Sequence, residues 1–253
     1  MSTEAMTTHQ VTWVVPCFDE ATRLDQAAFL ALADQPSTSL IFVDDGSHDQ
    51  TLPLLRRLAQ QRADRISVLE RPLNQGKAEA VRQGMLHALA GSAEMLGFVD
   101  ADLATPPAEL LRLAVMIRDG EFDLVFGSRV QLLGRSIERS PLRHYVGRVF
   151  ATCASLSLGL AAYDTQCGAK IFRRTPALAA ALGSPFSSRW AFDVELLGRL
   201  VRPGGGVPGL SISRIREEPL STWSDVPGSK LGPMAALQTG LELARIAWKL
   251  RRR

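Results

Sequence analysis

Two carboxylates one residue apart, Asp100 and Asp102, directly follow the apolar run MLGFV at residues 95–99. Such a run is typical of a buried strand, so the two acids would stand at its carboxyl end. Carboxylate oxygens are the ligands that Mg²⁺ and Mn²⁺ prefer, and these ions commonly keep coordination sites open for substrate phosphates. A solvated turn, or a cap for the helix that Pro106 opens, is the alternative. The position after an apolar strand favours the metal site.

A second acidic pair, Asp44 and Asp45, ends the apolar run LIFV and is followed by Gly46 and Ser47. One interpretation is an Asx-turn that leads into the next helix. The other is a carboxylate that accepts hydrogen bonds from a nucleotide base or a ribose. Both interpretations hold together if one aspartate makes the turn and the other binds.

Lys77 stands at the start of a predicted helix at 76–91, where the helix dipole disfavours a positive charge. This mismatch indicates another task, such as meeting an anion, and a surface lysine is the ordinary alternative. The spacing around Lys77 matches neither the P-loop nor the dinucleotide-binding fingerprint.

Strands and helices that alternate along the chain would position these residues. Strands are expected at 11–15 (ended by Pro16), 40–45, 66–70, 95–100, 123–129, 169–174 and 210–215. Helices are expected at 25–34, 50–61, 76–91, from Pro106 onward, and at 141–160, 189–201 and 234–250. This order predicts an α/β fold with a mostly parallel central sheet flanked by helices. Ligands of such sheets bind at the carboxyl ends of the strands, where Asp44-Asp45, Asp100-Asp102 and Ser128-Arg129 would meet.

Composition limits the class of protein. The 253 residues carry a net charge of +3, with 46% hydrophobic and 22% charged residues, which suits a packed domain. Three cysteines without a CxxC pair argue against a disulfide framework and against a zinc site. Residues 1–10 contain no apolar signal core and are expected to be a flexible N-terminus. The weakly polar stretch 149–163 is shorter than the ~20 residues that a membrane-spanning helix needs.

Basic residues gather at 129–148 and in the last nine residues, a pattern that favours phosphate groups or an anionic membrane surface. A solvated face and a frayed tail are the alternative. Segment 234–253 is expected to form a basic amphipathic helix that contacts the membrane without spanning it. One face would carry Leu237, Leu241, Ala244 and Trp248, and another Glu242, Arg245 and Lys249. No recognised nucleic-acid motif is present, so no nucleic-acid partner is expected.

Taken together, five segments resemble glycosyltransferase family 2, the inverting nucleotide-sugar enzymes with a GT-A fold. They are VVPCFDE, FVDDGSHDQT, LNQGKAEAVRQGM, FVDADLATP and VFGSR, in this order. The later segments DTQCGAKIF, RWAFDVELL and WSDVPGSKL are similar to the dolichyl-phosphate (polyprenyl-phosphate) β-glucosyltransferase branch. The similarity covers about residues 11–240. The chain departs from the family pattern at Phe18 and Asp19, in place of Tyr and Asn, and at Ala78, in place of Gly.

The resemblance implies one GT-A domain over 11–233, with a nucleotide-binding half at 11–128 and an acceptor-binding half at 129–233. It implies a nucleotide-sugar site made of Pro16, Phe18, Glu20, Asp44, Asp45, Lys77, Asp100, Ala101 and Lys230. Asp100 and Asp102 would hold Mg²⁺ or Mn²⁺ on the diphosphate. Catalytic roles would belong to Asp102, Arg129 and Asp193, and acceptor binding to Arg129, Lys170 and Arg189.

The resemblance further implies transfer of glucose from UDP-glucose to a polyprenyl phosphate or related lipid, in a single displacement without a covalent sugar–enzyme intermediate. The protein would be cytoplasmic and peripheral on the inner face of the cell membrane. The main alternative is a soluble family 2 enzyme with a hydroxyl acceptor, for which Asp193 would be the general base. A purely structural role, in which Asp193 and Glu195 pair with Arg189 or Arg199, is also open.

Two other classes fit less well. A nucleotidyltransferase would need a glycine-rich, basic N-terminal loop, which the sequence lacks. A non-catalytic module that binds nucleotide-sugars is disfavoured because Asp100, Asp102 and Lys230 are all present.

Overall fold

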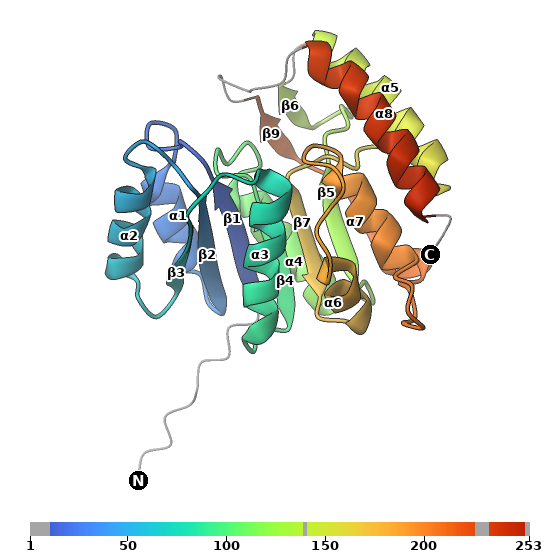
Figure 1. The fold of residues 1–253 in the computed structure, drawn as a ribbon. Coiled ribbons are helices and arrows are strands. Elements are labelled where there is room, and N and C mark those ends of the chain that lie inside the picture. Colours follow the sequence, from blue (N-terminus) through green and yellow to red (C-terminus); the bar gives the residue numbers. More distant parts are fainter. Residues whose placement is uncertain (1–10, 139–140, 226–232, 251–253) are drawn as a thin grey trace.

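The computed structural model of the chain describes residues 11–138, 141–225 and 233–250, and it describes side chains outside 139–146 and 226–241. A seven-stranded sheet lies at the centre, in the order β3-β2-β1-β4-β7-β5-β8 (Figure 1). Its strands are β1 (Val11–Cys17), β2 (Thr38–Asp45), β3 (Ile66–Arg71), β4 (Met95–Val99), β5 (Leu124–Ser128), β7 (Ala169–Arg173) and β8 (Ile215–Pro219). β6 (Ser136–Glu138) and β9 (Thr222–Ser224) form a separate parallel pair.

β7 runs antiparallel to both of its neighbours, β4 and β5, whereas the other strand pairs of the central sheet are parallel. The prediction of an α/β fold with a mostly parallel sheet is therefore confirmed. The sequence did not indicate that one strand from the second half of the chain is inserted between two strands from the first half.

Helices cover both faces of the sheet (Figure 1). One face packs against α1 (Gln26–Ala33), α2 (Thr51–Gln61) and α4 (Pro107–Asp119). The other packs against α3 (Lys77–Ala90), α6 (Pro176–Leu182) and α7 (Phe192–Val201). α5 (Pro141–Leu158) and α8 (Pro233–Leu250) lie side by side and pack against α7. Across the described residues, no helix has the length and apolar character to cross a membrane.

The strand residues alternate between the two cores. Val14 and Val43 belong to the core beneath α3, and their neighbours Trp13 and Phe42 belong to the core on the opposite face. This is the two-residue period of a strand whose two faces are both buried. Full burial of each such side chain contributes roughly 1.5–3 kcal/mol. α3 can approach the sheet closely because Gly84 has no Cβ. A Cβ at this position would overlap the side chain of Val14.

Two sequence-based expectations about the elements were wrong. Segment 210–215 is not a strand: a single 3₁₀ turn, η1 (Ile212–Arg214), precedes β8, which begins at Ile215. β8 reads IREEP, and its acids hold main-chain amides and arginines instead of packing in an apolar core. β1 continues through Pro16, which the sheet tolerates because pairing with β4 stops at Val14. α6, β6 and β9 were not expected.

Candidate active site

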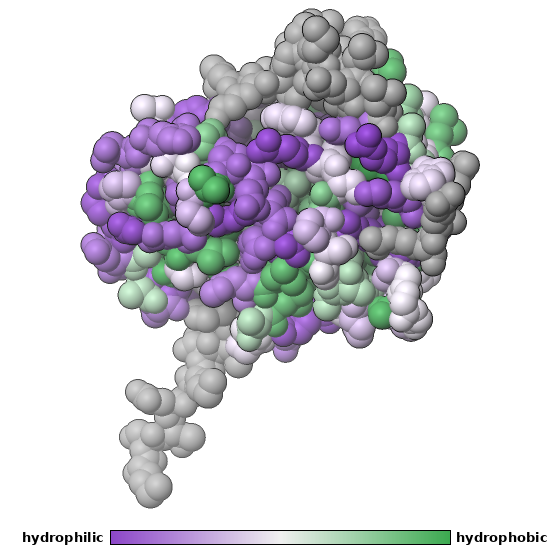
Figure 2. Space-filling view, viewed as in Figure 1, coloured by the Kyte–Doolittle hydropathy of each residue, from purple (hydrophilic) through white to green (hydrophobic). Residues whose placement is uncertain are grey.

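The polar strand ends that were predicted to meet do lie on one edge of the sheet. β1, β2 and β4 run in the same direction, and β5 shares it because β7 is antiparallel to both β4 and β5. Asp44 and Asp45 end β2, Asp100 follows β4, and Arg129 follows β5. This edge is uppermost in Figure 1, and Figure 2 shows hydrophilic side chains along it.

Asp100 forms an ion pair with the ammonium group of Lys77, the first residue of α3. The expectation that Lys77 meets an anion is thus confirmed, and the anion belongs to the chain itself. Burial lowers the pKa of Lys77, but the carboxylates of Asp100, Asp193 and Asp102 together raise it above its usual value. Gly168 leaves room for this arrangement, because a Cβ there would overlap the Asp100 carboxylate.

Asp102 is held by a tight turn. Its Oδ1 accepts a hydrogen bond from the amide of Ala104 at 3.2 Å, and the Leu103 amide donates to the carbonyl of Asp100 at 3.1 Å. Leu103 has φ 49°, a left-handed conformation that is rare for a leucine and that clusters at functional sites. Burial and the negative charge of Asp100 raise the pKa of Asp102. Ala101, between the two acids, is buried in the core.

The chemistry of Asp100 and Asp102 fits a divalent cation. Two carboxylates at the end of a buried strand supply hard oxygen ligands. Burial is the main cause of the raised pKa of Asp102 and the charge of Asp100 adds to it, so a cation beside both acids would favour their ionised forms. Within the described part of the chain, no group of three or more His, Cys, Asp and Glu side chains could hold a metal. Asp100 and Asp102 are thus the described side chains that would hold a cation here, and Mg²⁺ or Mn²⁺ commonly keeps further coordination sites for substrate phosphates and water.

The two acids at the end of β2 have different partners. Asp45 accepts hydrogen bonds from Arg71 and from the amides of Gln75 and Gly76, so it anchors the turn before α3. Asp44 accepts a hydrogen bond from the amide of Ser47 through Oδ2. Its Oδ1 is buried without a hydrogen-bond partner among the described groups. Asp44 therefore makes the predicted turn and keeps one acceptor available, whereas the carboxylate of Asp45 is committed to the protein.

The segment after β1 lies next to β2 at the same edge. The Glu20 carboxylate binds Arg23 through two hydrogen bonds of 2.8 and 2.6 Å, and its amide donates to Thr51 Oγ1 at 2.7 Å. The half-buried ring of Phe18 stands edge-on to His48, with 5.8 Å between centroids. Pro16 is the penultimate residue of β1. Glu20 thus shapes this loop, and Phe18 places an aromatic ring beside it.

Lys170, on β7, has a fully buried side chain. Its Nζ donates hydrogen bonds of 2.6 Å to Asp193 Oδ1 and of 2.6 Å to the carbonyl of Cys167. The expectation that Lys170 binds the acceptor is wrong, because its ammonium group is enclosed and paired. Asp193, in the first turn of α7, is only 4% exposed. Burial raises the pKa of Asp193, and Lys170 and Lys77 partly offset that shift.

Glu195, two residues beyond Asp193, has a structural role. It accepts hydrogen bonds from Arg199 at 2.7 Å and from the amide of Ser187 at 2.7 Å. The pairing of Glu195 with Arg199 that the sequence left open is therefore present. Asp193 pairs with Lys170, which the sequence did not indicate as its partner.

Arg189 lies at the turn before α3, near the end of β2, and not beside Arg129. Its Nη2 donates to Asn74 Oδ1 at 3.0 Å, and its guanidinium group covers Gly76. Gly76 has φ 95° and no space for a Cβ, so a glycine is required there. Asp45 anchors this turn at the end of β2, and three strands separate β2 from β5. This position does not support the expectation that Arg189 binds the acceptor.

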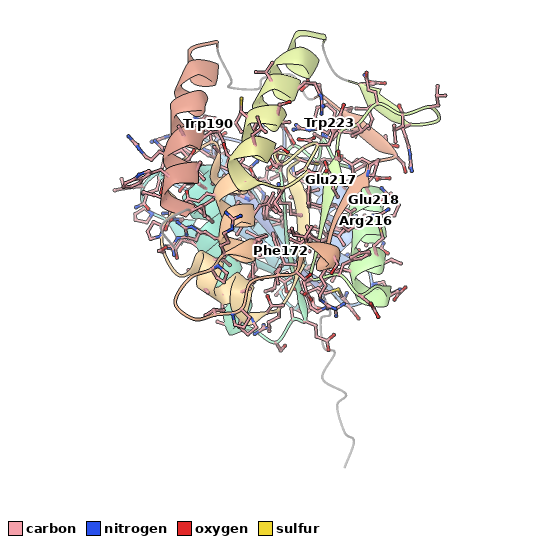
Figure 3. All side chains as sticks on the ribbon, turned by 90° about the vertical axis from the view of Figure 1, so that its right-hand side faces the viewer. Phe172, Trp190, Arg216, Glu217, Glu218 and Trp223 are labelled. Atoms are coloured by element: carbon pink, nitrogen blue, oxygen red, sulfur yellow. The ribbon has the colours of Figure 1, made fainter. Side chains whose placement is uncertain are left out.

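Arg129, at the end of β5, binds Asp164 through hydrogen bonds of 2.6 Å from Nε and 2.8 Å from Nη2. Its guanidinium group lies 5.4 Å from the ring centroid of Trp223 on β9. The carboxylate of Glu217, on β8, accepts hydrogen bonds from the amides of Tyr163 and Asp164 at 2.7 and 2.6 Å. Figure 3 labels Glu217 and Trp223 on this side of the molecule. The sequence did not indicate that Asp164 and Glu217 belong to this site.

A small pocket opens beside Arg129, between α5 and the loop before β7. Arg148 and Thr165 also line it. The Arg148 guanidinium group lies 3.6 Å from the ring centroid of Tyr163, and Thr165 Oγ1 is buried without a hydrogen-bond partner among the described groups. The pocket thus holds two guanidinium groups, one of them bound to the Asp164 carboxylate, and an available hydroxyl, and this net positive lining suits an anionic ligand. Lys230, the remaining predicted site residue, lies outside the described residues.

Known proteins share this fold and these motifs. The family model described as Glycosyl transferase family 2 matches residues 12–178. The chain belongs to glycosyl transferase family 2. Its curated relatives include the dolichyl-phosphate beta-glucosyltransferase of Drosophila melanogaster, which is 32% identical over 94% of this chain and 76% of that protein. The dolichyl-phosphate beta-glucosyltransferase of Homo sapiens is 31% identical over 96% of this chain and 78% of that protein.

Solved structures that resemble this family 2 glycosyltransferase include the glucosyl-3-phosphoglycerate synthase of Mycobacterium tuberculosis. The complex of that protein with Mn²⁺, UDP-glucose and phosphoglyceric acid has a TM-score of 0.65 and 20% identity, over 95% of this chain and 80% of the other. Its complex with Mn²⁺, UDP and glucosyl-3-phosphoglycerate has a TM-score of 0.65 and 19% identity, over 96% and 80%. The predicted GT-A fold, in a single domain, is confirmed.

Proposed function

We propose that this family 2 glycosyltransferase transfers glucose from UDP-glucose to a polyprenyl phosphate, with inversion at the anomeric carbon and with Mg²⁺ or Mn²⁺. The observation that carries the proposal is the pair Asp100 and Asp102 at the carboxyl end of β4, on the same edge as Asp44 with its available Oδ1. The names of the curated relatives and the Mn²⁺ and UDP-glucose of the solved neighbour support the choice of substrates.

On the donor side, Asp44 Oδ1 would accept a hydrogen bond from the base or the ribose, and Phe18 would stack on the base. Asp100 and Asp102 would hold the cation on the diphosphate, which Lys77 and Lys230 would also contact. When bound, the cation neutralises the negative charge that grows on the leaving diphosphate. The protein residues orient the donor so that its anomeric carbon faces the acceptor.

On the acceptor side, Arg129, Arg148 and Thr165 would bind the phosphate of the lipid. A phosphate is already ionised near neutral pH and can attack the anomeric carbon without a general base. The surroundings of Asp193 agree with this, because the residue is 4% exposed and its carboxylate is bound to Lys170. A hydroxyl acceptor with Asp193 as base is the alternative, and it would require this carboxylate to become accessible.

The outer surfaces of α5 and α8 support peripheral contact with the inner face of the membrane. Val149 and Leu156 on α5 are 68% and 77% exposed, and Trp248 on α8 is 53% exposed. Leu158 on α5 and Ile246 on α8 are buried in the core that includes α7, so the exposed residues belong to the opposite, outward side of each helix. Exposed Arg245 and Lys249 add positive charge suited to anionic lipid headgroups.

Release of UDP tests the proposal. The purified protein would be incubated with Mn²⁺ or Mg²⁺, a panel of UDP- and GDP-sugars, and short polyprenyl phosphates. We expect release from UDP-glucose that rises with the lipid phosphate, together with formation of the glycolipid. Asp102→Asn should abolish metal-dependent release while the thermal unfolding temperature stays close to that of the wild type. Asp119→Asn, on the exposed end of α4, is the matched control and should keep activity.

The same assay separates the alternatives. Full activity of Asp102→Asn would refute the metal assignment. Release that does not respond to the lipid phosphate, and that rises with a hydroxyl acceptor only while Asp193 is intact, would replace the phosphate acceptor with a hydroxyl.

A further inference from the structure

The ion pair between Lys77 and Asp100 occupies a carboxylate oxygen that the metal would need as a ligand. Asp100 is one of the two carboxylates at the end of β4, and its Oδ1 is the atom that meets the Lys77 ammonium group. This Oδ1 is buried, and the ammonium charge of Lys77 is its compensation in the described structure. A divalent cation on this oxygen and an ammonium group in contact with it would repel each other strongly at such short range.

Lys77 is held at this place by its surroundings. The backbone of the turn before it is anchored by Asp45, through the amides of Gln75 and Gly76. At the first residue of α3, the lysine charge meets the positive end of the helix dipole, so it depends on nearby anions. The anion in contact with its ammonium group is the carboxylate of Asp100.

Asp193 is a poor replacement for Asp100 as the partner of Lys77, because its charge is already paired. Its Oδ1 already accepts a hydrogen bond from the buried ammonium group of Lys170. If Lys77 left Asp100 without a new anion, a positive charge would remain beside a helix N-terminus at a partly buried position. The diphosphate of a nucleotide-sugar is an anion that would be brought to this edge together with the metal.

We propose that Lys77 acts as an internal substitute for the metal: it holds Asp100 in the absence of donor and releases it only when a diphosphate offers the ammonium group another partner. The cation then binds together with the nucleotide diphosphate and only weakly to the free protein. This inference rests on the proposed function for its metal site and its diphosphate ligand. It adds that Lys77 is a positioning residue that couples the two binding events.

Binding of Mn²⁺ in the absence of turnover tests the coupling. Free Mn²⁺ would be measured by electron paramagnetic resonance with the wild type and with Lys77→Met, each with and without UDP. We expect weak binding to the wild type alone and binding on the order of tenfold tighter or more when UDP is present. Lys77→Met should bind Mn²⁺ without UDP on the order of tenfold more tightly than the wild type, and UDP should then add less.

A second pair of variants shows whether the effect acts through Asp100. In an Asp100→Asn background, adding Lys77→Met should change the Mn²⁺ affinity much less than it does in the wild type, because the shared carboxylate charge is gone. Lys249→Met, which removes a lysine whose ammonium group binds Ser187 on another part of the molecule, is the matched control and should leave Mn²⁺ binding unchanged. Thermal unfolding gives an independent readout: Mn²⁺ alone should raise the melting temperature of Lys77→Met and not that of the wild type.

Three results would overturn the inference. They are tight Mn²⁺ binding by the wild type without UDP, no gain of affinity in Lys77→Met, and an equal gain in the Asp100→Asn background. Failure of the proposed function looks different, because Asp102→Asn would then bind Mn²⁺ and UDP together as tightly as the wild type does. If Asp102→Asn loses this joint binding while Lys77→Met behaves as the wild type, the metal site stands and only the inference on Lys77 fails.

Discussion

The carboxylate of Asp164 accepts three hydrogen bonds from Arg129, two from the guanidinium group and one from the backbone amide. Glu217 holds the backbone of the same loop through the amides of Tyr163 and Asp164. An acid on β8 thus fixes a loop, and that loop fixes the direction of the arginine that ends β5. This explains why a strand as polar as β8 belongs in the sheet.

Asp164→Asn should weaken acceptor binding without affecting the nucleotide. The substitution leaves a largely buried guanidinium group without its counter-charge, so the free energy of unfolding should fall by about 3 kcal/mol. With Arg129 less well directed, the KM for polyprenyl phosphate should rise by about tenfold, and the affinity for UDP should stay the same. Denaturant unfolding, steady-state kinetics and UDP titration measure the three quantities. Equal losses for UDP and for acceptor would contradict a role confined to the acceptor side.

Gly168→Ala should disturb the metal site with little effect on the fold. The new methyl group would overlap the Asp100 carboxylate, which sits at the end of a side chain that can rotate away. A displacement of this kind can reduce the rate by about a hundredfold. UDP release at saturating Mn²⁺ would measure the loss. Gly91→Ala, where the nearest atom to a new Cβ is 3.4 Å away, is the control, and similar activity in both variants would show that the Asp100 position is not critical.

Thiol labelling should distinguish the cysteines. Burial raises the pKa of Cys167 to about 11 and the pKa of Cys17 well above its usual range, whereas Cys153 is exposed on α5. The thiolate is the reactive form, and at pH 8 or 9 the two buried groups remain protonated and enclosed. N-ethylmaleimide should therefore modify Cys153 alone in the native protein and all three cysteines in denaturant. Peptide mass spectrometry would identify the cysteines that carry the label. Native labelling of Cys167 as fast as that of Cys153 would be inconsistent with this burial.

Binding to anionic vesicles should depend on the outer face of α5 and α8. Replacing Val149, Leu156 and Trp248 by serine removes exposed apolar side chains, and co-sedimentation with phosphatidylglycerol vesicles should fall by about tenfold or more. The matched control replaces Leu73, Val115 and Ile212, which are exposed on other elements, by serine. Equal loss in both variants, or no binding by the wild type, would contradict the proposed membrane contact.

Much of the fold was predictable from the sequence because its first half is regular. The apolar strands that end in Asp45 and Val99 are buried on both faces, and this leaves a continuous hydrophobic signature. Asp100 and Asp102 directly follow such a strand, so the sequence also predicts that they lie at the carboxyl edge of the sheet. The family then follows from the order of the motifs, which the family model and the relatives confirm.

The remainder depends on contacts between residues that lie far apart in the chain. Lys170 reads as an ordinary residue of the run AKIFRR, and its role appears only when β7 lies beside β4 and faces Asp193. Glu217 is hidden in a strand without apolar alternation, and its partners lie more than fifty residues away along the chain. No local pattern carries this information, so tertiary structure was needed to reassign Lys170 and to find Glu217.

The insertion of β7 has a consequence for how the protein can be made and changed. β5 pairs only with β7 and β8 within the described sheet, so it has no neighbour until residues far downstream have been synthesised. A nascent chain that ends near Ser128 would hold a strand without a partner and an open side of β4, both exposed to aggregation. The boundary between the two expected functional halves is therefore not a place where the molecule can be cut. An exchange of acceptor halves between relatives would also exchange a strand from the middle of the sheet, and with it the lysine that holds Asp193.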